Sequence, residues 1–79
     1  MQIKVLFFGA TADIVGSREL VLSLPENSKA IDAFQKVIKE FPSLEKHKLL
    51  FAVNEEYSKG EELLKEGDEL AIFTAVSGG

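Results

Sequence analysis

The side chains of this 79-residue sequence offer little for a free-standing active site. The sequence has no cysteine and a single histidine, His47, which lies in a polar stretch. The lack of cysteine excludes a cysteine nucleophile, a thiolate zinc site and a disulfide scaffold. The carboxylates lack the alternating spacing of a calcium loop, and no pair of them is placed by spacing for acid–base catalysis. We therefore expect no catalysis by this chain on its own, and no bound metal or cofactor.

The reactive group that remains is the α-carboxylate of Gly79. We expect a flexible Ser-Gly-Gly tail over residues 77–79, after one domain formed by residues 1–76, because glycine has no side chain to pack and is costly to order. A tail that ends in Gly78 and Gly79 fits a channel too narrow for other residues. Its carboxylate is inert to nucleophiles until it is activated, for example as an acyl-adenylate, so this chemistry needs a partner enzyme. A frayed terminus without a function is the alternative interpretation.

Charge and composition argue against two classes of binding partner, nucleic acids and membranes. The net charge of −4 argues against a nucleic-acid-binding protein, which needs a basic face, and a charge-steered partner should present a basic surface. No apolar run approaches the roughly 18 residues of a membrane span, and the N-terminus lacks a signal-peptide pattern. We therefore expect neither nucleic acid nor membrane as a partner. The cysteine-free sequence fits a reducing cytosol, so we expect a cytoplasmic protein.

Hydrophobic periodicity predicts the elements that must position this tail. Alternating or continuous apolar runs predict strands over residues 2–8, 18–24, 49–54, 57–58 and 69–76. Apolar residues at helical spacing predict an amphipathic helix of about three turns, which begins after Ser28 as its N-cap and stops at Pro42. Residues 9–17 begin near one glycine and end near another, and we expect a loop there that could hold a short helical turn.

This order of elements predicts a two-layer α+β domain of the β-grasp type. One main helix is the only regular cover that the sequence offers for a mixed sheet of about five strands. We expect the first strand at the centre of the sheet, the last strand parallel beside it, and the helix packed across them. A rearranged ferredoxin-like half-domain is the alternative, but it needs a second full helix that we do not find.

Four stretches carry a resemblance to a known family. They are residues 3–8 (IKVLFF), 51–57 (FAVNEEY), 66–72 (EGDELAI) and 76–79 (VSGG). The most specific feature is the sequence Gly-Asp-Glu at the start of the last predicted strand, combined with Ser-Gly-Gly at the end of the chain. On these residues the whole chain resembles the ubiquitin-like β-grasp sulfur carriers, and within that family the small subunits of molybdopterin synthase.

The resemblance implies a chemical role for Gly79. An E1-like enzyme would adenylate the carboxylate with ATP, and sulfur transfer would then give a C-terminal thiocarboxylate. The carrier would insert its tail into the large subunit of molybdopterin synthase. There it would donate sulfur to cyclic pyranopterin monophosphate and form the dithiolene of molybdopterin, a step of molybdenum cofactor biosynthesis. ATP is used by the activating partner, so no cofactor is expected on this chain, and the family implies a heterotetramer of two small and two large subunits.

The resemblance also implies a contact surface for the large subunit. The residues expected there are Phe8, Tyr57, Phe73, Val76 and Ser77. Phe8 and Phe73 share the faces of their strands with Lys4 and Glu69, which should be the less buried side. Exposed aromatic residues of this kind often anchor interfaces. The alternative is that Phe8 and Phe73 complete the small core.

The chain departs from the family pattern in two places. Thr74-Ala75 stands where the family commonly has Pro-Pro, and Ala12 stands where many relatives carry a basic residue. Thr74 and Ala75 therefore regain amide donors that proline lacks, which could lengthen the last strand.

Three other functions remain open on the sequence. The chain could carry sulfur for thiamine synthesis or tRNA thiolation, and only its partners would distinguish these pathways. It could be a ubiquitin-like protein modifier, with Gly79 joined to a lysine through an isopeptide bond. It could also be a plain interaction domain whose tail has no function.

Overall fold

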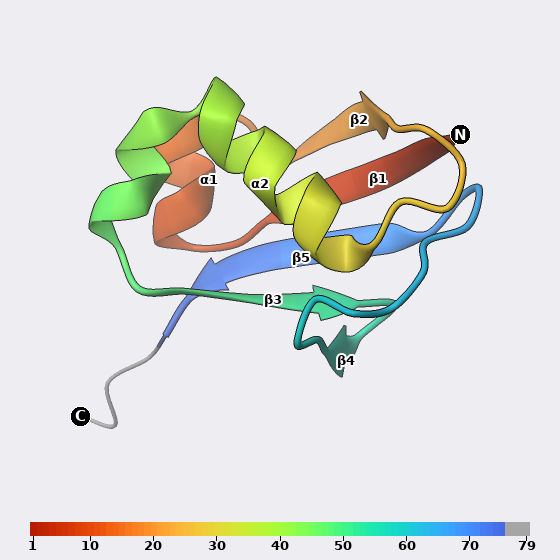
Figure 1. The fold of residues 1–79 in the computed structure, drawn as a ribbon. Helices are drawn as coiled ribbons and strands as arrows, with labels where there is room; N and C mark the ends of the chain where they lie inside the picture. Colours follow the sequence, from red (N-terminus) through yellow and green to blue (C-terminus); the bar gives the residue numbers. More distant parts are fainter. Residues whose placement is uncertain (76–79) are drawn as a thin grey trace.

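A sheet covered on one face by helices makes up the protein, and the computed structural model describes residues 1–75 of it (Figure 1). Its elements in order are β1 (Gln2–Phe7), α1 (Ala10–Val15), β2 (Glu19–Ser23), α2 (Ala30–Glu40), the 3-10 helix η1 (Pro42–Lys46), β3 (Leu49–Val53), β4 (Glu56–Tyr57) and β5 (Glu69–Thr74). The predicted α+β architecture of β-grasp type, with one main helix across a mixed sheet, is confirmed.

The sheet has five strands in the order β2-β1-β5-β3-β4. β1 runs parallel to β5, and the other neighbouring pairs are antiparallel. The prediction of a parallel pair formed by the first and last strands is therefore confirmed. The expected centre was wrong by one position, because β5 occupies the middle of the sheet and β1 is the interior strand beside it.

Alternation along the strands builds the core on the helix-covered face. Ile3, Val5, Leu70 and Ile72 of β1 and β5 are at most 1% exposed, and Val37 of α2 is fully buried among them. Aromatic contacts tie the helical layer to the sheet: the rings of Phe34 and Phe51 stack at 4.6 Å, and those of Phe7 and Phe41 meet edge-on at 6.3 Å. Burial of this apolar face is the main force that holds the two layers together.

The start of α2 differs from the prediction by one residue. Lys29 occupies the N-cap, and the hydroxyl of Ser28 donates instead to the carbonyl oxygen of Pro25 at 2.7 Å. The first free amides of the helix are satisfied by the backbone of the segment before β5. The N–H of Ala30 donates to Glu62 O, and that of Ile31 to Gly60 O, both at 2.9 Å. These carbonyl acceptors make a side-chain cap unnecessary.

Thr11 fixes the short helix α1 to the sheet. Its side chain is fully buried, and Oγ1 accepts from the N–H of Phe8 at 3.0 Å. The hydroxyl hydrogen can reach two carbonyl oxygens, that of Phe8 at 2.7 Å and that of Ile72 at 2.9 Å. One side chain therefore joins α1 to the ends of β1 and β5. The region expected to be a loop with a possible helical turn holds a helix of six residues.

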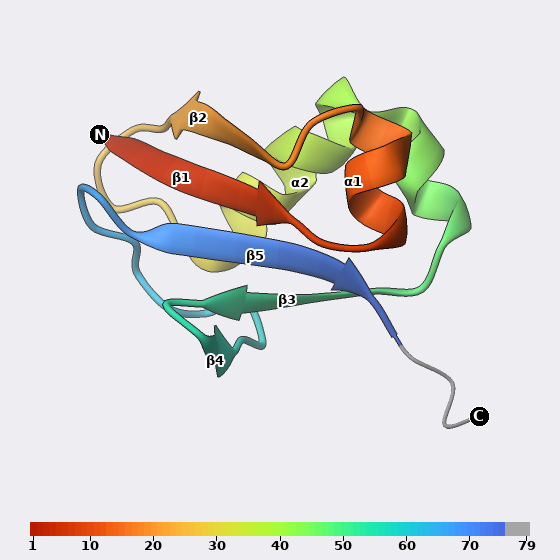
Figure 2. The ribbon, with the colours of Figure 1, turned by 180° about the vertical axis from the view of Figure 1, so that it is seen from behind.

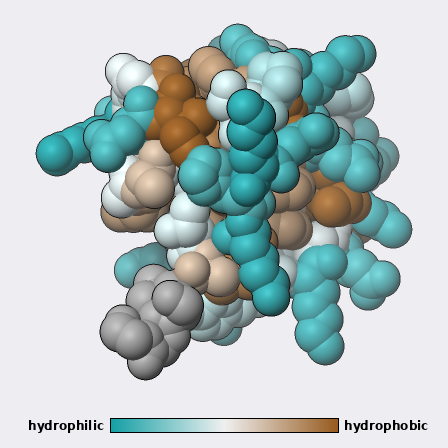
Figure 3. Space-filling model, turned by 90° about the vertical axis from the view of Figure 1, so that its left-hand side faces the viewer, coloured by the Kyte–Doolittle hydropathy of each residue, from teal (hydrophilic) through white to brown (hydrophobic). Residues whose placement is uncertain are grey.

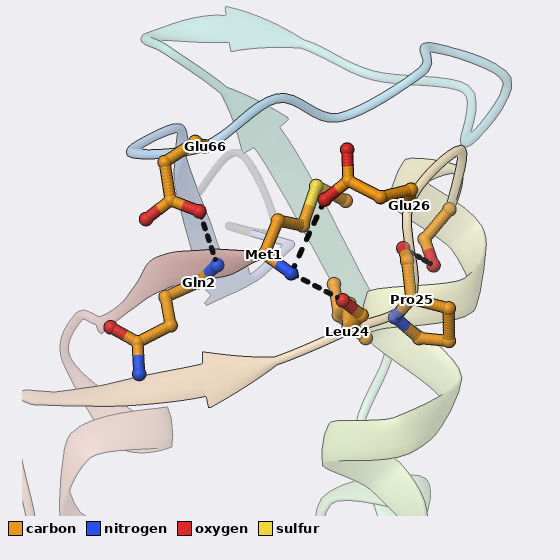
Figure 4. A network of polar contacts seen from close by, with 7 residues as sticks. Met1, Gln2, Leu24, Pro25, Glu26 and Glu66 are labelled. Atoms are coloured by element: carbon orange, nitrogen blue, oxygen red, sulfur yellow. Dashed lines mark hydrogen bonds and ion pairs between the residues drawn. The ribbon is translucent and has the colours of Figure 1, made fainter.

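Polar contacts close the opposite end of the sheet, where β1 begins (Figure 4). The N-terminal ammonium of Met1 donates to the carbonyl oxygen of Leu24 at 2.8 Å and lies 3.4 Å from a carboxylate oxygen of Glu26. The N–H of Gln2 donates to the carboxylate of Glu66 at 2.9 Å. These contacts join the start of β1 to the segment after β2 and to the segment before β5.

Candidate functional site

The sheet leaves one face without helical cover, seen in front of the helices in Figure 2. We call it the open face, and its side chains alternate with those of the core. The strand register places on it Lys4, Leu6 and Phe8, Glu19 and Val21, Leu50 and Ala52, Tyr57, and Glu69, Ala71 and Phe73.

Apolar side chains are exposed on the open face. Phe8 is 53% exposed, Val21 63%, Leu50 38% and Tyr57 77%. Within residues 1–75 the one other large apolar side chain that is exposed belongs to Leu63, which lies outside the open face. A 79-residue chain has few apolar side chains to spare, so their concentration on one face makes the open face the candidate docking surface.

The predicted contact residues Phe8, Tyr57 and Phe73 lie close together. Phe8 and Phe73 line the same hollow of about 420 Å³, and the ring of Phe73 lies 5.8 Å from that of Tyr57. Phe8 is too exposed to complete the core, so that alternative is wrong for Phe8. Phe73 is half-buried, with Tyr57 beside it. Pairing of β4 with β3 is what brings Tyr57 next to β5.

Carboxylates lie along one side of the apolar part of the open face. Glu55 and Glu69 line the hollow together with the aromatic residues. Asn54 orders this rim: its Oδ1 accepts from the N–H of Glu69 at 3.0 Å, and its Nδ2 donates to Asp68 at 3.1 Å. The role of Asn54 was not predicted, although its position in a turn and its tolerance of the left-handed φ of 48° are typical of asparagine.

The chain leaves the sheet at the edge of the open face. Thr74 pairs with Leu49, and the N–H of Ala75 donates to the carbonyl oxygen of Lys48 at 2.9 Å. A proline at position 75 could not make this bond, so the expected gain of an amide donor is confirmed there. The predicted sites Val76, Ser77, Gly78 and Gly79 lie outside the described residues, as does the predicted domain boundary after residue 76. Their roles stay predictions.

The described titratable groups do not form a catalytic cluster. His47 is exposed, and among residues 1–75 no group of three His, Asp or Glu could hold a metal ion. The hydroxyl of Ser58 donates to the carboxylate of Glu62, and this bond is the main reason that the pKa of Glu62 is lowered below its ordinary value. Within the same residues no helix is long and apolar enough to cross a bilayer.

Known proteins resemble this chain over its full length. A family model described as the ThiS family matches residues 5–79. Proteins named molybdopterin synthase sulfur carrier subunit are 36% identical in Chlamydomonas reinhardtii, with 100% of both chains covered, and 35% identical in Homo sapiens, with 99% of this chain and 94% of the human protein covered.

Solved structures share the fold. SAMP1 from Haloferax volcanii superposes with a TM-score of 0.88 at 26% identity, with 100% of both chains covered. One chain of a complex of subunits 1 and 2 of the molybdopterin-converting factor from Helicobacter pylori superposes with a TM-score of 0.72 at 20% identity, also with full coverage of both chains. These neighbours confirm the β-grasp fold.

Proposed function

Because the chain belongs to the ThiS family, we propose that it is the sulfur carrier subunit of a molybdopterin synthase. The observation that carries the proposal is its 35–36% identity, over essentially the full chain, to proteins of that name. The open face and the nearby end of β5 support it, because a carrier needs a surface for docking and a reactive end beside that surface. By this assignment the chain is a subunit, and catalysis belongs to the assembled enzyme.

The reacting group in this proposal is the carboxylate of Gly79. An oxygen of this carboxylate attacks the α-phosphorus of ATP on an E1-like partner, and pyrophosphate leaves. A sulfide equivalent then attacks the carbonyl carbon of the acyl-adenylate. The bond between this carbon and the bridging oxygen breaks, and AMP leaves with that oxygen. The product is a thiocarboxylate at Gly79, and Gly78 keeps the tail slim enough to enter both active sites. No side chain of this chain is assigned a catalytic role.

The acceptor in this proposal is cyclic pyranopterin monophosphate on the large subunit. Each thiocarboxylate delivers one sulfur, whereas a dithiolene contains two, so two charged carriers serve each product molecule. This stoichiometry fits an assembly of two small and two large subunits. Water then hydrolyses the bond between the carbonyl carbon of Gly79 and the transferred sulfur, so the carrier returns to its carboxylate form and is charged again.

The open face is the surface that we assign to the large subunit. Phe8, Tyr57 and Phe73 would be its central contacts, with Val76 and Ser77 at the root of the tail. The Helicobacter pylori structure that resembles this chain is a complex of subunits 1 and 2 of the molybdopterin-converting factor. This supports a large-subunit partner for this chain. The acidic rim formed by Glu55 and Glu69 calls for basic side chains on that partner. We place the protein in the cytoplasm, where ATP for the activating enzyme is present.

The donor step can be tested apart from activation. The chain is prepared with a thiocarboxylate at Gly79 by chemical ligation and mixed with the large subunit from the same genome and cyclic pyranopterin monophosphate. We expect molybdopterin to form, detected by mass spectrometry, while the carboxylate form and a chain without Gly79 give none. An intact thiocarboxylate on a chain that binds the large subunit would contradict the proposal. Lysine-linked conjugates of the chain in a cell lysate, where activating enzymes and ATP are present, would instead identify a protein modifier.

A further inference from the structure

A second hollow adjoins the open face on the other side of Phe8. It measures about 520 Å³, and its lining includes Leu6, Phe8, Gly9 and Ala12 and the charged residues Asp13, Arg18 and Glu19. We call it the α1 groove. We propose that the contact with the large subunit continues past Phe8 into the α1 groove, where Arg18 binds a carboxylate of that subunit. This inference rests on the proposed function.

Phe8 forms a ridge between the two hollows. Leu6 and Phe8 line both the hollow on the open face and the α1 groove. Phe8 is 53% exposed, so its ring is accessible to a partner. The α1 groove is therefore continuous with the surface already assigned to the large subunit. Figure 3 shows the end of the molecule that carries α1, where apolar surface lies between hydrophilic side chains.

The walls of the α1 groove are held in place by the backbone. Gly9 turns the chain from β1 into α1 with φ 56° and ψ −127°, a conformation that side chains disfavour. Thr11 anchors α1 through its buried hydroxyl, and the carbonyl oxygen of Arg18 accepts from the N–H of Phe7 at 2.9 Å. Ala12 contributes only a methyl group. The groove is therefore preformed, so ordering it costs little free energy when a partner segment binds.

Arg18 is available to a partner. It is the single arginine of the sequence, and its side chain is exposed. Within residues 1–75 the ion pairs are Met1 with Glu26 and Lys4 with Glu19, so no carboxylate there holds the guanidinium. A guanidinium binds a carboxylate through two parallel hydrogen bonds, and arginine is enriched at the energetic centres of interfaces.

The charges on the two hollows select different groups of one partner. Glu55 and Glu69 on the open face require basic side chains, whereas Arg18 in the α1 groove requires an acidic one. Asp13 and Glu19 also line the groove. Glu19 already pairs with Lys4 at 3.7 Å, so a donor of the partner belongs opposite Asp13. The occupant is therefore a segment of the large subunit that presents a carboxylate to Arg18, and this contact fixes the orientation of the carrier around Phe8.

The test is a titration of the large subunit with Arg18 variants of the full chain by isothermal titration calorimetry. We expect Arg18→Gln to raise Kd about tenfold and Arg18→Glu to raise it further, because a charged hydrogen-bonded pair is lost and then reversed. Lys39→Glu is the matched control for Arg18→Glu, because both substitutions make the same change in net charge. Lys39 lies on α2, on the covered side of the sheet. We expect it to change Kd less than about twofold. Circular dichroism verifies the fold of each variant.

Three results would overturn the inference. If Arg18→Glu binds like the parent chain while Phe73→Ala loses binding, the interface stops at Phe8 and the proposed function stands. If Lys39→Glu weakens binding as much as Arg18→Glu, the effect belongs to net charge and the α1 groove holds no specific contact. A parent chain that fails to bind the large subunit would overturn the proposed function as well, which separates the two failures.

Discussion

Phe73 is the residue at which docking and folding can be separated. It is half-buried on the open face and lies 5.8 Å from the ring of Tyr57. We expect Phe73→Ala to raise Kd for the large subunit about tenfold or more, because a central aromatic anchor is lost. The accompanying loss of stability should be smaller than for a fully buried phenylalanine. Calorimetric titration and urea unfolding measure the two effects.

Phe51→Ala is the control for this prediction. Phe51 is also half-buried on the sheet, but its ring stacks on Phe34 on the helix-covered side at 4.6 Å. We expect this variant to lose stability and to keep its affinity for the large subunit. If Phe73→Ala lowers binding and stability in the same proportion as Phe51→Ala does, Phe73 is a core residue.

Thr11 is the polar residue on which the junction of α1, β1 and β5 depends. Valine has nearly the same shape but no hydroxyl, so Thr11→Val removes an acceptor for the N–H of Phe8 and the buried hydroxyl that donates to the carbonyl oxygens of Phe8 and Ile72. The N–H of Phe8 keeps the carbonyl oxygen of Ile72 at 3.3 Å. We expect the free energy of unfolding to fall by about 1–3 kcal/mol. Thr11→Ser keeps the hydroxyl and should recover most of the hydrogen-bond contribution. Equal urea midpoints for Thr11→Val and the parent chain would show that these bonds contribute nothing.

Glu62 provides a pH-dependent readout of the segment before β5. The hydrogen bond from Ser58 lowers the pKa of Glu62 in the folded chain, so its ionised form is favoured by folding. This contribution is present above the unfolded-state pKa and is lost as the pH falls through the lowered folded-state pKa. We expect Ser58→Ala to raise the pKa of Glu62 toward its ordinary value in an NMR titration. An unchanged titration curve would assign the shift to the backbone.

At the scale of elements, sequence reasoning succeeded where periodicity is strong. Alternation in β1 and β5 and the apolar stripe of α2 predicted those elements to within about two residues, which is the usual uncertainty of element boundaries. Ser28 was assigned as the N-cap because its hydroxyl suits that position. The real acceptors are carbonyl oxygens of Gly60 and Glu62, far along the sequence. Nothing local in the sequence could identify them.

The segment before β5 gives the prediction that belongs to this scale. Gly60 has φ 98°, and a Cβ added to it would lie 2.9 Å from Cβ of Ile31 in α2. We expect Gly60→Ala to lower the free energy of unfolding by about 2 kcal/mol or more, since backbone strain and a steric clash combine. Gly67→Ala is the control, because Gly67 has φ 85° but no atom within 4 Å of the added Cβ. Similar urea midpoints for both variants would contradict the clash.

At the scale of the whole molecule, the two faces of one sheet have different tasks. The helix-covered face stabilises the fold, and the open face presents Phe8, Tyr57 and Phe73 beside the point where β5 ends. Alternation predicted which side of their strands Phe8 and Phe73 occupy, and the family resemblance selected all three residues. The two hollows beside Phe8 could not be predicted, because they depend on how α1 and β4 pack against the sheet. Arg18 therefore could not be identified as a contact residue from the sequence alone.

The intact mass of the protein after incubation with an E1-like enzyme, ATP and a sulfur donor tests the central claim most directly. A sulfur carrier must gain the mass difference between one sulfur and one oxygen, and fragmentation must place that change on Gly79. We expect this shift, and we expect none when Gly79 is deleted. A folded chain that keeps its original mass with the activating enzyme of its own genome would contradict the carrier function.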